Sequence, residues 1–134
     1  MLPLGGCGNT VTKQDVIKRA DAICASTLRE VRALTSPALN APYLDHLAAL
    51  IGAEAAQLEK LPRPARDRAL LDQYLAAVAR VAAGYRALAA VSKQGDNGRV
   101  AAALAALRVN PAPALATRYG MSVCAGTSGT AVAR

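Results

Sequence analysis

The chain has 134 residues, the size of one ordinary domain and long enough to bury a core without metals or cross-links. It has no Trp or Phe and four Tyr, while alanine supplies 32 residues, so its composition predicts an all-α protein. The formal net charge of +7 favours anionic surfaces in general, but the basic residues are spread out and form no run that indicates a specific partner.

The first eleven residues precede the predicted domain. Leu4-Gly5-Gly6-Cys7 resembles the lipobox of bacterial lipoproteins, in which the chain is cut before the cysteine and the thiol carries a diacylglycerol. Six residues before Cys7 are too few for a secretory signal. We therefore expect residues 1–11 to be the remnant of a signal and a short tether, with lipidation at Cys7. The alternative is a disordered end with a free thiol.

The first helix is expected from Thr12 to Leu34. Thr12 and Asp15 have the spacing of a capping box, and Pro37 follows the last turn. Apolar residues recur with the period of a helix, and Cys24 lies on their face.

The second helix is expected from Ala41 to Lys60, with Asn40 as its N-cap. Its apolar stripe consists of Leu44, Leu47, Ile51, Ala55, Leu58 and Leu61. The acidic residues here and in the next segment form no catalytic pair. We expect Glu54, Glu59, Asp67 and Asp72 to be solvated.

The third helix is expected from Pro64 to Lys93 and has the most regular pattern. Its seam consists of Leu71, Tyr74, Val78, Val81, Tyr85 and Leu88. This heptad spacing favours packing along nearly aligned helices. Arg80 and Arg86 interrupt the most apolar window, so we expect no membrane-spanning helix.

The fourth segment is expected to begin near Arg99, after a turn at Gly95, with Asp96 or Asn97 as its N-cap. Asn110-Pro111 should break it, because a proline inside a helix removes a hydrogen bond and clashes with the preceding turn. A short helix should then run from Pro111 to Tyr119. Residues 125–134 should form a disordered tail.

Residues 12–124 are therefore expected to form an up-down antiparallel four-helix bundle with a broken last helix. The alternative is a long hairpin of the second and third helices, flanked by two looser segments. In the bundle the first and last helices are neighbours, so we expect a disulfide between Cys24 and Cys124, which would suit an exported protein. The alternative is two buried free thiols.

No pattern indicates a catalytic, cofactor or metal site. His46 is the single histidine, and it has no nucleophile or cluster of metal ligands at a suitable spacing. There is no glycine-rich phosphate loop. Tyr74 and Tyr85 lie on the seam and would not be available for stacking, so nucleic acid is not expected as a partner. We predict that the protein is not an enzyme.

Two stretches carry a resemblance to a known group. Residues 12–24, ending in Ala-Asp-Ala-Ile-Cys24, and residues 116–124, ending in Gly-Met-Ser-Val-Cys124, resemble the two ends of small secreted helical lipoproteins of high-GC Gram-positive bacteria. That resemblance implies a helical bundle, a disulfide and export. The group is of uncharacterised function, so it implies no activity.

These observations lead to a primary functional hypothesis and two alternatives. The primary one is a non-enzymatic extracytoplasmic lipoprotein, anchored to the membrane and acting as a binding or structural accessory, with an envelope protein as its expected partner. The first alternative is a carrier of a small apolar ligand or lipid in a cavity between helices. The second is a cytoplasmic bundle that binds anionic partners. The sequence leaves the oligomeric state open.

Overall fold

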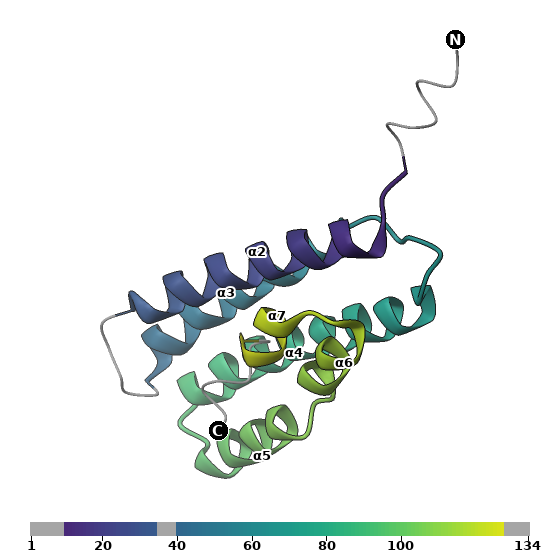
Figure 1. The fold of residues 1–134 in the computed structure, drawn as a ribbon. Coiled ribbons are helices and arrows are strands. Elements are labelled where there is room, and N and C mark those ends of the chain that lie inside the picture. Colours follow the sequence, from purple (N-terminus) through teal and green to yellow (C-terminus); the bar gives the residue numbers. More distant parts are fainter. Residues whose placement is uncertain (1–9, 35–39, 128–134) are drawn as a thin grey trace.

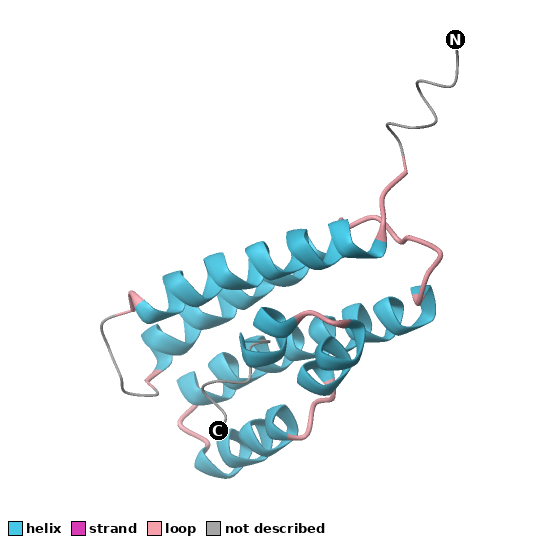
Figure 2. Cartoon of the chain, viewed as in Figure 1, coloured by secondary structure: helices cyan, strands magenta, loops and turns pink. Residues whose placement is uncertain are grey.

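The computed structural model describes residues 10–34 and 40–127, and these residues form helices and no strands (Figure 2). The helices are α2 (Lys13–Arg32), α3 (Ala41–Glu59), α4 (Arg68–Lys93), α5 (Asn97–Arg108), α6 (Ala112–Tyr119) and α7 (Ser122–Thr127). The all-α prediction is confirmed. Helix α7 ends at Thr127, so the first three residues of the expected tail are helical, and the other seven lie outside the described residues.

The predicted caps form at three helix starts. The Thr12 hydroxyl accepts from the Asp15 N–H, and the Asp15 carboxylate accepts from the Thr12 N–H, which completes the capping box of α2. Asn40 caps α3 through the N–H of Tyr43, and Asp96 caps α5 through the N–H of Arg99. These caps are confirmed because a cap depends on local spacing alone.

Helix α4 begins four residues later than predicted. Asp67 adopts a left-handed backbone conformation, with φ of 57°, immediately before the first helical residue. Its carboxylate accepts a hydrogen bond from Lys13 Nζ at 2.7 Å. Arg63 holds the preceding loop, since its guanidinium contacts the Glu59 and Asp72 carboxylates. The loop between α3 and α4 is therefore fixed by ion pairs that a propensity argument does not see.

Helix α4 is the centre of the fold. It packs against α3, α5 and α6, while α2 packs against α3 and α7. Figure 1 shows α2 and α3 side by side, α4 next to them, and α5 at the edge away from α2. All six residues of the predicted α4 seam are buried, at most 2% exposed. This part of the prediction is confirmed.

The last third of the chain does not form one broken helix of a four-helix bundle. It folds back as three short helices, with α5 and α6 on α4, and α7 between α6 and α2. The predicted four-helix up-down bundle is not confirmed, and the alternative of a flanked α3–α4 hairpin describes the contacts better. The predicted break does occur. Asn110 accepts from the N–H of Ala112 and donates through Nδ2 to the Ala77 carbonyl oxygen, which ties the break to α4.

Candidate functional site

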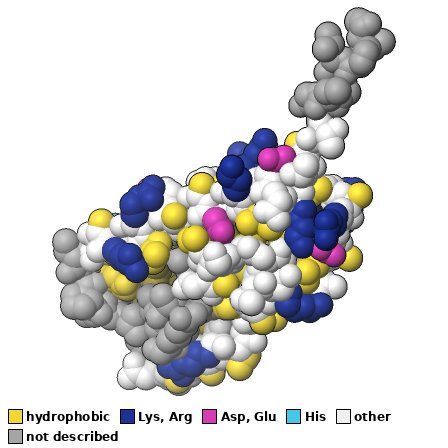
Figure 3. Space-filling view, in the orientation of Figure 1, with side chains coloured by type: hydrophobic (Ala, Val, Ile, Leu, Met, Phe, Trp, Pro, Cys, Tyr) yellow, Lys and Arg dark blue, Asp and Glu magenta, His cyan; other side chains and the backbone are white. Residues whose placement is uncertain are grey.

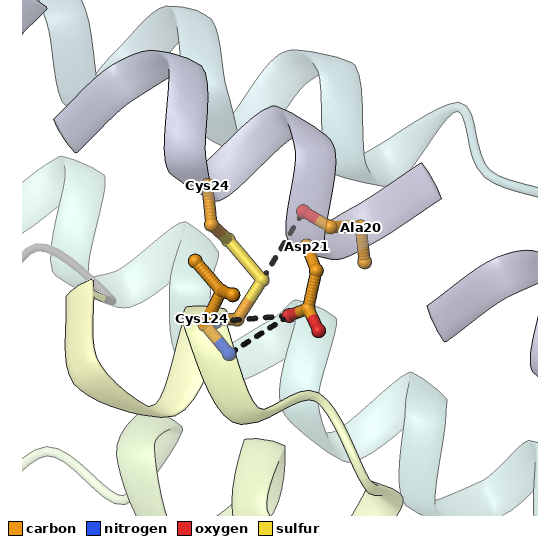
Figure 4. Close-up of a disulfide and its surroundings, with 5 residues drawn as sticks. Ala20, Asp21, Cys24 and Cys124 are labelled. Carbon is orange, nitrogen blue, oxygen red and sulfur yellow. Dashed lines mark hydrogen bonds between the residues drawn. A yellow bond between two sulfur atoms is a disulfide. The ribbon is translucent and has the colours of Figure 1, made fainter. Parts of the chain in front are cut away.

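A disulfide joins α2 to α7 at the centre of the described structure. The Sγ atoms of Cys24 and Cys124 are 2.07 Å apart, and their Cα atoms are 5.2 Å apart. Both residues are fully buried (Figure 4). The predicted bridge is confirmed, and it joins residues that are 100 positions apart. The partner of α2 is the small helix α7, which was not predicted, rather than a long fourth helix.

The carboxylate of Asp21 lies beside this disulfide. Its Oδ1 accepts hydrogen bonds from the backbone N–H groups of Val123 and Cys124, each at 3.1 Å. These are the second and third residues of α7, whose first N–H groups have no partner within the helix. Asp21 therefore caps α7 from another helix, and a negative charge is favourable at that end.

The sulfur of Cys124 makes a further close contact. It lies 3.3 Å from the carbonyl oxygen of Ala20, as the dashed line in Figure 4 shows. A disulfide sulfur carries no hydrogen, so we treat this approach as a packing contact rather than a hydrogen bond. Two adjacent residues of α2 therefore contact Cys124, Asp21 through its carboxylate and Ala20 through its backbone oxygen.

A buried carboxyl group lies between α2 and α3. It is on α3 and faces Thr27, which follows Cys24 by three residues in α2. The side chain of Glu54 is on α3, is 1% exposed, and forms a hydrogen bond with Thr27 on α2. Its Oε2 atom is buried without a hydrogen-bond partner. Removal from water raises the pKa of Glu54 from 4.5 to about 7, and the Thr27 hydrogen bond opposes part of that rise.

The prediction that Glu54 is solvated was wrong. Glu59, Asp67 and Asp72 are exposed, as predicted, and pair with Arg63 or Lys13. A sequence signal for Glu54 did exist. Positions 44, 47, 51, 58 and 61 follow alternating steps of three and four if position 54 belongs to the same stripe. Its place on an apolar seam outweighed the usual exposure of glutamate.

A second junction ties the start of α2 to α4 and α6. Lys13 Nζ bonds to Asp67 and also lies 4.7 Å from the ring centroid of Tyr119. The Lys13 hydrogen bond lowers the pKa of Asp67, and burial raises the pKa of Tyr119. These contacts hold the start of α2 against the first residue before α4 and against α6.

Two hollows of the described surface border the ends of α2, and neither is enclosed. One, of about 360 Å³, lies by the start of α2 and the α3–α4 loop, next to Thr12 and Arg66. The other, of about 380 Å³, is mostly apolar and lies between the end of α2 and the start of α3, beside Leu34 and Leu50. His46, which is exposed, borders the second. Neither has the shape of an elongated cavity between helices.

Cys7, the predicted lipidation site, lies outside the described residues. Within residues 10–34 and 40–127, no group of three or more His, Cys, Asp or Glu side chains is placed to hold a metal ion. Figure 3 shows the charges on one face, where dark-blue basic groups are separate and few acidic ones lie between them.

Two stretches are long and apolar enough to cross a membrane on length and composition alone. They are Arg68–Lys93 and Asn97–Tyr119. The first is α4, which is the core helix of this fold and passes the test for that reason. The second joins α5 and α6 across the break at residues 109–111. No membrane-spanning role follows from either.

No family model matches the chain, and neither a curated protein nor a solved structure matches it. The resemblance to small secreted lipoproteins therefore rests on the residues quoted above. The function has to be argued from this chain alone.

Proposed function

We propose that this protein is a non-enzymatic extracytoplasmic helical protein, anchored to the membrane by lipid on Cys7 and acting as a binding or structural accessory. The observation that carries the proposal is the Cys24–Cys124 disulfide. Structural disulfides persist in oxidising compartments and are rare in the cytosol. The bridge is buried, and it closes the fold between its first and last described helices, which is a structural rather than a catalytic arrangement.

The lipobox-like run supports the anchor. Two residues separate Cys7 from Thr10, the first described residue, and α2 begins at Lys13. Cleavage before Cys7 would leave a tether of about five residues between the acyl chains and the domain. Stable attachment needs two lipid chains or an equivalent second signal, which the diacylglycerol of a lipoprotein supplies.

The buried carboxyl does not support an enzyme. Glu54 is held away from solvent, and neither surface hollow is lined by it. A general acid or base must reach a substrate proton directly or through one water molecule. We do not propose the carrier either, because both described hollows are open surface depressions.

Intact mass spectrometry of the protein from its native host tests the proposal. Free thiols are alkylated before and after reduction, and a Cys7→Ala variant serves as the matched control. We expect a mass that fits cleavage before Cys7 with acyl chains added, and alkylation of Cys24 and Cys124 only after reduction. The control should lose the acyl mass and leave the membrane fraction. A native protein with three free thiols and no acyl mass would overturn the proposal.

A further inference from the structure

One helix of the fold is much less covered than the others. Helix α5 packs substantially on α4 alone among the described helices, chiefly through Leu107, and it lies at the edge of the molecule (Figure 1). Leu107 is its one fully buried residue. Eight of its twelve residues are exposed. This outward surface is the part of the described structure with the fewest tertiary contacts to explain it.

The chemistry of the outward surface is apolar in the middle and basic at both ends. Its apolar part consists of Ala101, Ala102, Ala105, Ala106 and Val109, all exposed. Val109 is 80% exposed and is the large hydrophobic residue that the described structure leaves most open. Arg99 and Arg108 flank this part, about 14 Å apart along the helix. We call these seven residues the α5 surface.

The part of the chain that includes α5 carries mostly basic charge. Residues 73–127 contain six basic residues and one acidic residue, Asp96. Asp96 is already used as the N-cap of α5 and as an ion-pair partner of Arg99. The exposed side chains of Arg80 and Arg86 on α4 have no acidic partner within the described residues. An anionic partner is therefore complementary to the α5 surface and its surroundings.

We propose that the α5 surface rests on the anionic leaflet of a lipid bilayer. Arginine stems can lie along apolar surface while their guanidinium groups reach lipid phosphates, and Val109 and the alanines would enter the headgroup boundary between them. This inference rests on the proposed function only for the lipid anchor on Cys7, which would bring the domain to the membrane. It adds which face of the domain meets the bilayer.

Two other occupants fit this surface less well. In a dimer packed α5 against α5, an antiparallel arrangement would place Arg99 of one copy against Arg108 of the other. A parallel arrangement would place each arginine against its own equivalent. Like charges would meet in both arrangements. A nucleic acid would use exposed aromatic side chains or a polar groove. Here, Tyr74, Tyr85 and Tyr119 are buried, and the centre of the surface is apolar.

Vesicle sedimentation with the full, oxidised chain tests this inference. A Cys7→Ser substitution excludes any lipid anchor, so the vesicle contact is measured apart from it. Vesicles contain phosphatidylglycerol and phosphatidylcholine, or phosphatidylcholine alone, at low ionic strength. We expect binding to the anionic vesicles and none to the neutral ones, with affinity falling as salt is added.

A pair of matched variants locates the contact. Arg99→Gln with Arg108→Gln should weaken binding about 25-fold, at about fivefold for each basic residue next to an anionic leaflet. Arg19→Gln with Arg32→Gln removes the same charge from exposed positions of α2, which packs against α3 and α7, and should weaken binding less than threefold. Val109→Asp should also weaken vesicle binding relative to the parent, although it leaves Arg99 and Arg108 in place.

The outcomes separate the inference from the proposed function. Equal weakening by both double variants, absence of vesicle binding, or binding to duplex DNA in place of vesicles would each overturn the α5 surface and leave the lipid on Cys7 unaffected. A native protein without acyl chains would overturn the anchor, and vesicle binding by the α5 surface would still stand. Circular dichroism and the intact disulfide confirm that each variant is folded.

Discussion

The carboxylate of Asp21 in α2 accepts a hydrogen bond from the backbone N–H of Cys124 in α7 at 3.1 Å, across 103 residues of sequence. One turn further along α2, Cys24 forms the disulfide with the same residue. A hydrogen bond and a covalent bond thus hold α7 on α2 from adjacent positions.

Removing the Asp21 carboxylate should loosen α7. Asp21→Ala removes the oxygen that accepts from two N–H groups of α7, and loss of a helix cap costs about 0.5–2 kcal/mol. Asp21→Asn keeps an oxygen acceptor but loses the charge, so its loss of stability should be smaller. Urea unfolding of the oxidised proteins gives the free energies of unfolding. Equal stability of the Ala variant and the parent would show that the cap contributes nothing.

Breaking the disulfide should destabilise the whole domain. The bridge closes a loop of 100 residues, for which the chain-entropy model gives about 4.7 kcal/mol, within a usual range of roughly 2–5 kcal/mol. Cys24→Ser with Cys124→Ser, or reduction of the parent, should lower the melting temperature. Hydrogen exchange should increase first in α6 and α7. A Cys7→Ser variant is the control and should melt like the parent.

The buried carboxyl predicts a stability that falls as the pH rises. Burial raises the pKa of Glu54 from 4.5 to about 7. Between these values the folded protein holds a proton that the unfolded chain has released, so the proton favours the folded state. The stabilisation is complete below pH 4.5 and is lost by about pH 7, where the charged carboxylate must stay buried. The total effect is roughly 3 kcal/mol.

A glutamine at this position removes that contribution. Glu54→Gln should be more stable than the parent above pH 7, with the difference shrinking toward pH 5. Glu59→Gln is the exposed comparison on the same helix, and it should not reproduce the gain of Glu54→Gln above pH 7. Chemical unfolding at a series of pH values measures both. A parallel profile for the parent and Glu54→Gln would contradict the raised pKa.

The contact between α4 and α5 is sensitive to a single methyl group. A Cβ at Gly84 would lie 2.9 Å from Leu107 Cδ2, closer than side chains approach in folded proteins. Gly84→Ala should gain about 1 kcal/mol from helix propensity. It should lose a similar amount because the new methyl group displaces Leu107. In a Leu107→Ala background the same substitution should stabilise by about 1 kcal/mol. A double-mutant cycle from urea unfolding measures the coupling, and additive effects would contradict the contact.

The helices themselves follow from local sequence. Thr12 with Asp15, Asn40 and Asp96 start their helices where predicted, and Gly120 adopts the left-handed conformation that closes α6. The α4 seam was identified by its spacing because a helix presents every third or fourth residue on one side. Caps and periodicity act within a few residues, so a chain read on its own can reveal them.

Tertiary structure decided what local spacing could not. We expected Glu54 to be solvated. The α2–α3 contact buries it instead, because it lies on the apolar stripe of α3. The last third of the chain folds back as α5, α6 and α7. This arrangement depends on the hydrogen bond from Asn110 to α4 and on Asp21, which caps α7 from 102 residues away. The sequence by itself determined an all-helical chain with a paired Cys24 and Cys124. Only packing determined which helix α2 meets there, because contacts between distant residues depend on how all the faces fit together.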